Sequence, residues 1–173
     1  MPFTALGLMP ELTRALADRN YTVPTPVQAR VIPEILAGRD ILAGSQTGTG
    51  KTAGFTLPVL QLLNALENPG RSPRAVVLVP TRELAAQVAD SIKSYGKYLR
   101  LRTLVIFGGV SINPQIDALH RGADILVATP GRLLDHARQG NVDLKQVEVL
   151  VLDEADRMFN RSEEHTSELQ SPI

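Results

Sequence analysis

Short apolar runs alternate with longer amphipathic stretches along most of the chain, and this alternation limits the fold more than any other feature of the sequence. The runs have the length and the Val, Ile and Leu content of buried strands, and the stretches between them have the period of helices. A strand, a helix and a second strand in this order form a right-handed crossover between parallel strands. The sequence therefore predicts an α/β domain with a parallel sheet that carries helices on both faces. The expected strands are 40–44, 75–80, 102–108, 124–129 and 148–153, and the expected helices between them are 50–66, 82–98, 111–121 and 131–139.

Two further helices are expected before the first strand. One begins at Pro10 and the other begins near Pro26, because proline is favoured at the first helical position. The second is expected to end at Gly38 and contains Pro33, which predicts a kink.

The composition fits one domain and excludes several classes of protein. The chain has 173 residues and no cysteine, which excludes disulfides, thiol nucleophiles and cysteine metal sites. No apolar run approaches the ~20 residues that span a bilayer, and the N-terminus lacks the pattern of a secretion signal. We therefore expect a cytoplasmic protein without a membrane role.

Net charge alone gives little support for nucleic-acid binding. The whole chain has a formal net charge of +0. Arg161, Glu163, Glu164 and Glu168 lie near the end, so residues 1–160 carry 17 basic and 15 acidic side chains. A nucleic-acid site must therefore come from the placement of its side chains.

Glycine and polar segments directly follow the expected strands. Ligands of parallel α/β sheets bind beyond the carboxyl ends of the strands, where the next helices begin. The segments GSQTGTGKT, PTRE, GG, TPGR and DEAD all have this position. The sequence therefore predicts one composite site at that edge of the sheet.

The segment GSQTGTGKT has the features of a phosphate-binding loop. Gly48 and Gly50 allow the backbone to approach a polyphosphate, Lys51 can neutralise its β and γ phosphates, and the Thr52 hydroxyl can bind Mg²⁺. The usual pattern has a glycine where this chain has Ser45, which is a small substitute. The alternative is a glycine-rich turn that only caps a helix. The expected nucleotide contacts in this segment are Ser45, Gln46, Thr47, Gly48, Thr49, Gly50, Lys51 and Thr52.

The apolar run before Asp153 is expected to deliver two carboxylates to the same edge. Asp153 would hold Mg²⁺ through water, and Glu154 would position and polarise the attacking water. The alternative is an acidic helix N-terminus, which suits Asp156.

Together these motifs resemble the first RecA-like domain of DEAD-box ATP-dependent RNA helicases. The motifs are PTPVQ at 24–28, PTREL at 80–84, GG at 108–109, TPGR at 129–132 and DEAD at 153–156. The resemblance covers residues 1–160, and FTALGLMPELTRAL and TGTGKTAGFTLPVLQLL are most similar to the bacterial RhlE-type branch. It implies a RecA-like P-loop fold in which Lys51, Asp153 and Glu154 act in ATP hydrolysis.

The resemblance also implies an adenine site near the N-terminus. Gln28 would bind the adenine edge with its side-chain amide, Tyr21 would pack on the ring and Phe3 would close the pocket. From the residues alone, Tyr21 and Phe3 are more often ordinary packing residues. The family usually has glycine where this chain has Asn20, but asparagine tolerates positive φ, so we expect the turn to persist. Ser45 likewise replaces the usual alanine.

The segments after the other strands are expected to bind the sugar-phosphate backbone of RNA without reading its sequence. Arginines pair with phosphates, helix N-termini and hydroxyls bind phosphate oxygens, and glycines permit close approach. The alternative is that PTRE and TPGR only open helices. We read His120, His136 and His165 as surface residues and not as metal ligands. The expected RNA contacts are Pro80, Thr81, Arg82, Gly108, Gly109, Thr129, Pro130, Gly131 and Arg132.

The function that these motifs imply is that of the N-terminal half of an ATP-dependent RNA helicase, with ATP and Mg²⁺ as cofactors. In this family a second RecA-like domain supplies arginine fingers, and it is absent here, so we expect the fragment to bind ATP weakly with negligible turnover. The alternatives are a non-enzymatic module that binds RNA or ATP, an inert truncated chain, and a DNA helicase or other P-loop ATPase.

The last 13 residues, 161–173, do not continue the family pattern. The expected SAT motif does not follow DEAD, and RSEEHTSELQS is what a common sequencing-adapter oligonucleotide encodes. We expect 161–173 to be a non-native tail; the alternative is a divergent natural one.

Overall fold

The computed structural model describes residues 2–38, 49–65 and 70–154, and of residues 49–51 it describes the backbone only. Its four described strands are β1 (Ala75–Leu78), β2 (Thr103–Ile106), β3 (Ile125–Ala128) and β4 (Val149–Leu152). All pair in parallel, in the order β2-β3-β1-β4. The predicted parallel sheet is therefore confirmed. The expected strand 40–44 lies outside the described residues.

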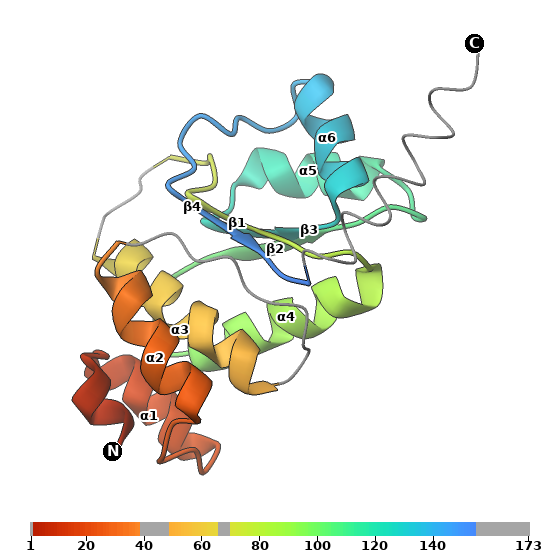
Figure 1. The fold of residues 1–173 in the computed structure, drawn as a ribbon. Coiled ribbons are helices and arrows are strands. Elements are labelled where there is room, and N and C mark those ends of the chain that lie inside the picture. Colours follow the sequence, from red (N-terminus) through yellow and green to blue (C-terminus); the bar gives the residue numbers. More distant parts are fainter. Residues whose placement is uncertain (1, 39–48, 66–69, 155–173) are drawn as a thin grey trace.

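Helices cover both faces of the sheet, as predicted. α3 (Thr49–Asn64) and α4 (Arg82–Tyr95) lie on one face, and α5 (Asn113–Arg121) and α6 (Pro130–Arg138) lie on the other (Figure 1). A short 3₁₀ helix η1 (Phe3–Leu6), α1 (Pro10–Asp18) and α2 (Pro26–Leu36) form a further layer beyond α3 and α4. Both α1 and α2 begin at the predicted prolines, and Pro33 lies inside α2.

Alternate strand residues face the two layers of helices. Val77, Val127 and Val151 belong to the larger cluster with α1 to α4, whereas Val76 and Leu126 belong to the smaller cluster with α5 and α6. Burial on both faces is the reason why these strands are apolar runs without alternation in the sequence.

Side-chain caps mark the starts of α2 and α4. The Thr25 side chain accepts from the Gln28 N–H and the Gln28 side chain accepts from the Thr25 N–H, which forms a capping box at the start of α2. Thr81 caps α4 by accepting from the Leu84 N–H at 3.1 Å. α4 ends at Tyr95, three residues earlier than predicted, and Gly96 follows it.

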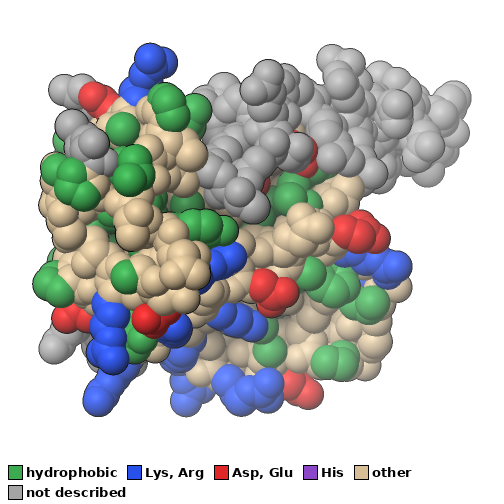
Figure 2. Space-filling model, turned by 90° about the horizontal axis from the view of Figure 1, so that it is seen from below, with side chains coloured by type: hydrophobic (Ala, Val, Ile, Leu, Met, Phe, Trp, Pro, Cys, Tyr) green, Lys and Arg blue, Asp and Glu red, His purple; other side chains and the backbone are tan. Residues whose placement is uncertain are grey.

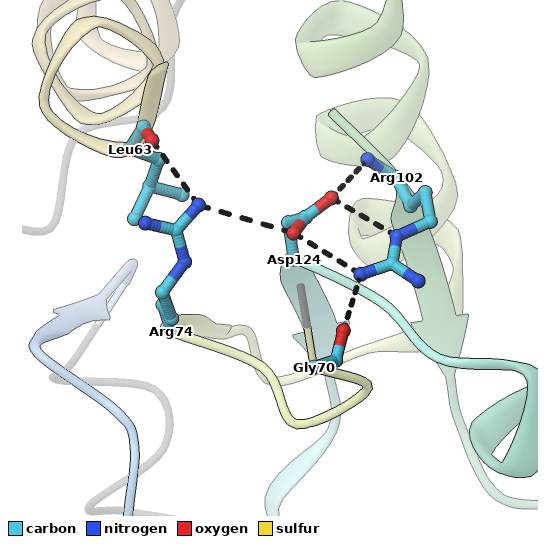
Figure 3. A network of polar contacts seen from close by, with 5 residues as sticks. All are labelled: Leu63, Gly70, Arg74, Arg102 and Asp124. Atoms are coloured by element: carbon cyan, nitrogen blue, oxygen red, sulfur yellow. Dashed lines mark hydrogen bonds and ion pairs between the residues drawn. The ribbon is translucent and has the colours of Figure 1, made fainter. Parts of the chain in front are cut away.

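A buried carboxylate joins the amino ends of three strands (Figure 3). Asp124, which precedes β3, accepts from the backbone N–H of Arg102 at 2.7 Å and from its guanidinium at 3.2 and 3.3 Å. Arg102 precedes β2 and also donates to the Gly70 carbonyl. Arg74, which precedes β1, lies 3.9 Å from Asp124 and donates to the Leu63 carbonyl at the end of α3. This network fixes the end of the sheet opposite to the predicted site.

Cations and aromatic rings join α1 to the end of α4. The Arg14 guanidinium lies 4.1 Å from the centre of the Tyr98 ring, and Lys97 forms an ion pair with Asp18 at 2.7 Å. Figure 2, which views the molecule from the side of α1 and α4, shows many Lys and Arg side chains there. Since some of these cations serve intramolecular contacts, the charge of this face is not by itself a sign of RNA binding. None of the helices in the described residues is long and apolar enough to cross a membrane.

Candidate functional site

The segments that follow the four strands meet at one edge of the sheet. Backbone hydrogen bonds continue past the strand ends: Val79 N–H donates to the Ala128 carbonyl, Thr129 N–H to Ile106 and Asp153 N–H to Leu78, all at 2.9 to 3.0 Å. The register of the parallel strands therefore aligns their carboxyl ends. The residues that come next in the chain form a common rim.

At the end of β4, this rim carries two buried carboxylates. Asp153 is 4% exposed and Glu154 is 2% exposed. Glu154 has a φ of 54°, in the left-handed region that side chains other than glycine rarely adopt. Such backbone costs about 1–2 kcal/mol and is concentrated at functional sites. The chain therefore turns sharply where the sequence predicts its catalytic carboxylates.

The predicted phosphate loop is only partly described. Ser45, Gln46, Thr47 and Gly48 lie outside the described residues, as does Asp156. Thr49, Gly50 and Lys51 open α3, and the side chain of Thr52, in the first turn, is half-buried. α3 thus begins where the sequence predicts a helix N-terminus directed at phosphate.

The predicted adenine residues lie in and around the start of α2. Gln28 is 6% exposed, and its Oε1 accepts from the Thr25 N–H at 2.9 Å, which fixes the orientation of the amide. Tyr21 is 40% exposed, whereas Phe3 is buried in the core. The Phe3 N–H donates to the Thr22 carbonyl at 3.4 Å, so η1 and the Tyr21 segment are adjacent.

The three segments predicted to contact RNA are brought together. A side-chain carbon at Gly109, which has a φ of 79°, would lie 3.6 Å from Nη1 of Arg82. Arg132 Nη2 donates to the Val110 carbonyl at 2.9 Å. PTRE and TPGR therefore flank the Gly108–Gly109 pair on the two sides.

The helix N-termini of these segments differ in their capping. The Thr81 side chain already accepts a bond from α4, whereas the side chain of Thr129 makes no capping bond to α6. Pro80 is buried, and Pro130 and Gly131 are exposed at the start of α6. The start of α6 is thus the more available N-terminus for an anion.

The prediction for His136 was wrong, and sequence reasoning missed Gln115. His136 is 0% exposed and lies 2.9 Å from Oε1 of the buried Gln115. Burial, and then the positive charge of Arg132, hold its pKa below the ordinary value, against the opposing charge of Asp135. The spacing of three residues from Leu133 could have placed His136 on the buried face of α6. His120 is exposed, as predicted, and His165 lies outside the described residues.

A cavity of about 210 Å³ lies at the opposite end of the sheet, between Arg71, His120 and Asn141. None of the predicted site residues lines it. The rim at the carboxyl ends of the strands therefore remains the candidate site.

Comparison with protein-family models matches residues 25–172 to the family described as DEAD/DEAH box helicase. The chain is 47% identical over 158 residues to ATP-dependent RNA helicase DeaD of Mycobacterium tuberculosis strain H37Rv, which covers 91% of this chain and 28% of that protein. It is 46% identical over 158 residues to the protein of the same name from Escherichia coli strain K12, with 91% and 25% covered. The chain thus spans about a quarter of the length of these relatives.

A solved structure has the same fold. The crystal structure of a DEAD box protein from the hyperthermophile Methanococcus jannaschii superposes with a TM-score of 0.85 and 42% sequence identity. The superposition covers 94% of this chain and 44% of that one.

Proposed function

The chain belongs to the DEAD/DEAH box helicase family, and from this premise we propose that it is the N-terminal, ATP-binding and RNA-binding half of an ATP-dependent RNA helicase. The observation that carries the proposal is the common rim at the carboxyl ends of the strands. There the buried Asp153 and Glu154 share one edge with the Arg82, Gly109 and Arg132 cluster. A nucleotide site and a nucleic-acid site on one rim allow each ligand to influence the other.

In this proposal the two carboxylates at the end of β4 have separate roles. Asp153 and the Thr52 hydroxyl would hold Mg²⁺, and Glu154 would orient and polarise the attacking water. Lys51 would neutralise the β and γ phosphates. Bound Mg²⁺ would supply positive charge where negative charge develops on the phosphates.

The residues present are a reasonable fit for Mg²⁺. Asp153 is held at the rim by its backbone N–H, which donates to the Leu78 carbonyl, and would supply hard carboxylate oxygens there. Within the described ranges no group of three or more His, Cys, Asp and Glu gathers as a metal site. Mg²⁺ does not require such a group, because it usually takes one or two carboxylates together with phosphate oxygens and water.

Gln28 would select adenine, with Tyr21 on the ring face and Phe3 supporting the segment from the core. The capping box supports this role, because it holds the amide of Gln28 in one orientation. A preorganised amide loses less entropy when the base binds.

RNA would bind through its backbone along Arg82, Gly109 and Arg132 and the start of α6. Phosphate and sugar contacts carry no sequence information, so we expect RNA of any sequence to bind. The whole enzyme would separate short duplexes by local distortion of one strand. The second RecA-like domain would complete both sites, and the 173-residue chain alone would bind ATP weakly and turn it over negligibly.

Two finer assignments accompany this proposal. FTALGLMPELTRAL and TGTGKTAGFTLPVLQLL favour the RhlE-type branch. The match of RSEEHTSELQS to an adapter oligonucleotide favours a domain of residues 1–160 followed by a non-native tail. The nucleotide sequence of the gene tests the second, and codons unlike that oligonucleotide from Arg161 onward would contradict it.

The test of the function is ATP hydrolysis by the full-length protein with RNA or DNA of the same sequence. We expect stimulation by RNA, and loss of adenine preference in Gln28→Ala. Equal stimulation by DNA would favour a DNA helicase. No hydrolysis with either nucleic acid, together with retained binding, would favour a non-enzymatic module. Robust unwinding by the 173-residue chain would contradict the need for a second domain.

A further inference from the structure

A buried network of hydrogen-bonded polar side chains connects α5 and α6 beneath the rim. His136 Nε2 lies 2.9 Å from Gln115 Oε1, and Asn141 Nδ2 lies 3.2 Å from His136 Nδ1. Gln115 Oε1 also accepts from Arg132 Nη1 at 3.1 Å, and Gln115 Nε2 donates to the Phe107 carbonyl at 2.8 Å. His136 is 0% exposed and Gln115 is 9% exposed. The network therefore runs from Asn141 through the protein to Arg132.

The hydrogen-bond partners in this network fix which atoms carry the protons. Gln115 must present its amide N–H₂ to the Phe107 carbonyl, so its oxygen faces Arg132 and His136. An oxygen acceptor requires a proton on Nε2 of His136. Asn141 Nδ2 also donates to Gln139 Oε1 at 3.1 Å, which places the amide N–H₂ toward His136 and makes Nδ1 the acceptor. His136 is therefore a neutral imidazole with its proton on Nε2.

Gln115 holds both sides of the glycine pair at the rim. Its Nε2 binds the carbonyl of Phe107, which directly precedes Gly108, and its Oε1 binds Arg132. Arg132 in turn donates to the carbonyl of Val110, which directly follows Gly109. The amide of Gln115 thus sets where Arg132 lies relative to the Gly108–Gly109 backbone.

A purely structural role explains this arrangement less well. An apolar side chain at the position of His136 would fill the core without the cost of desolvating a polar group. A buried polar network in which every hydrogen bond is formed is rigid and specifies a single arrangement. Here that arrangement reaches the two segments proposed to contact RNA.

We propose that His136 and Gln115 are positioning residues for RNA, which hold Arg132 and the Gly108–Gly109 backbone in one arrangement before the RNA backbone binds. This inference rests on the proposed function, in which Arg132 and the glycine pair contact RNA. A phosphate-binding arginine that is already fixed loses less conformational entropy on binding. His136 acts only through Gln115 and does not touch RNA.

The first test needs no RNA. Long-range ¹H–¹⁵N NMR spectra of the 173-residue chain report which imidazole nitrogen of His136 carries the proton. We expect Nε2–H in the wild type. A proton on Nδ1 would overturn the inference, because Gln115 Oε1 would then face an acceptor.

The second test measures affinity for a fluorescein-labelled oligouridine by fluorescence anisotropy. His136→Phe replaces the imidazole with a slightly larger aromatic ring that has no nitrogens. We expect it to weaken RNA binding about tenfold, roughly the effect of losing one hydrogen bond. Arg132→Ala should weaken binding by at least as much, and the double variant should lose no more than Arg132→Ala alone. Additive losses would overturn the inference, since they mean that His136 does not act through Arg132. His120→Phe, at an exposed position on α5, is the control that should bind as the wild type does.

Asn141 is half-buried, and a variant there tests the same network if His136→Phe does not fold. In the wild type, a proton added at Nδ1 faces the amide N–H of Asn141 and turns His136 into a cation, which repels Arg132 and competes with it for Gln115 Oε1, while Asp135 opposes this charge. RNA affinity should therefore fall at acid pH. In Asn141→Asp the carboxylate accepts from Nδ1–H, so RNA affinity should be retained at acid pH. It should fall as pH rises and Nδ1 of His136 loses its proton. The same pH profile in both proteins would overturn the inference.

These experiments separate the inference from the function on which it rests. If Arg132→Ala weakens RNA binding and neither His136→Phe nor Asn141→Asp has an effect, only the inference falls. If Arg132→Ala has no effect, the proposed RNA contact fails and the inference fails with it.

Discussion

Gly54 on α3 packs directly on Gln28 of α2, and a side-chain carbon at Gly54 would lie 4.0 Å from the Cα and the Cγ of Gln28. The nearest atom would be Val31 Cγ1, also on α2, at 3.9 Å. These are ordinary van der Waals distances, so there is room for one methyl group between α3, which follows the predicted phosphate loop, and α2, which carries the proposed adenine-binding Gln28.

Gly54→Ala should therefore stabilise the protein. Alanine in a helix interior is favoured over glycine by about 0.5–1 kcal/mol, and here the methyl group meets no clash. Urea denaturation should show a free energy of unfolding higher by about that amount, with ATP affinity unchanged. Gly54→Leu is the matched variant: its larger side chain should push α2 away and weaken ATP binding. A destabilised Gly54→Ala would mean that the two helices are closer than described.

Asn20 has a φ of 61°, as its place in the sequence predicted. Its N–H donates to the Ala17 carbonyl and the Tyr21 N–H donates to Leu16, which is the Schellman pattern at the end of α1. Asn20→Gly should keep the free energy of unfolding within about 0.5 kcal/mol, because glycine adopts this conformation freely. Asn20→Val should lower it by about 1–2 kcal/mol. Equal stability of the two variants by thermal or urea denaturation would contradict the turn.

Asp124→Asn should destabilise the protein by about 2 kcal/mol, because it removes the charge that Arg102 and Arg74 face. The value lies below the ~3–5 kcal/mol typical of a broken buried ion pair, since the Arg102 side chain is 44% exposed and water screens it. Urea denaturation at neutral pH measures the loss. Asp117→Asn, at an exposed position on α5, is the control and should change stability by less than about 0.5 kcal/mol.

The same carboxylate predicts loss of stability in acid. Burial alone would raise the pKa of Asp124, but the hydrogen bonds and charge of Arg102, with the charge of Arg74, outweigh burial and hold the pKa below 3.8. The unfolded chain therefore takes up a proton before the folded chain does. The contribution of Asp124 is complete above its unfolded pKa and is lost as pH falls through the folded pKa. Denaturation between about pH 5 and about pH 3 should show a smaller loss in Asp124→Asn than in the wild type.

His136 predicts a second dependence at higher pH. Its folded pKa is lowered from 6.5, so below that pH the unfolded chain binds a proton that the folded chain does not. The free energy of unfolding should therefore decrease as pH falls from about 7 toward about 5. His136→Gln should show a shallower slope in this range. An unchanged slope would mean that His136 is not held neutral.

The sequence was sufficient to predict the fold class and most elements because strand burial and helix caps are local signals. All four described strands and the helices around them lie within about three residues of their expected ranges. The positive φ of Asn20 could be predicted because asparagine tolerates this conformation and stands where the family usually has glycine. The short helix Phe3–Leu6 was missed, since four residues are too few for a helical period.

The interior polar contacts could not be predicted because they join positions far apart in the chain. Arg102 and Asp124 are 22 residues apart, and Gln115 and His136 are 21 apart. The neighbours of each residue in the sequence do not indicate which distant residue it contacts. Only the parallel register, which places α5 beside α6, turns His136 and Gln115 toward each other.

Gly122 should be harder to replace than Gly140, because both its backbone conformation and its surroundings are more restrictive. It has a φ of 103° and a ψ of 155°, a region open essentially to glycine alone, and a side-chain carbon there would lie 3.0 Å from the Arg71 Cα and 2.7 Å from Arg102 Nη1. Gly140 also has a positive φ, 75°, but no atom lies within 4 Å of the position of its side chain. Gly140→Ala should therefore cost only the left-handed backbone, about 1 kcal/mol. Gly122→Ala should cost about 3 kcal/mol or more, because backbone strain is added to displacement of Arg102 from Asp124. Urea denaturation of the two variants measures the difference, and equal losses would show that the strand ends around Asp124 can move apart without cost.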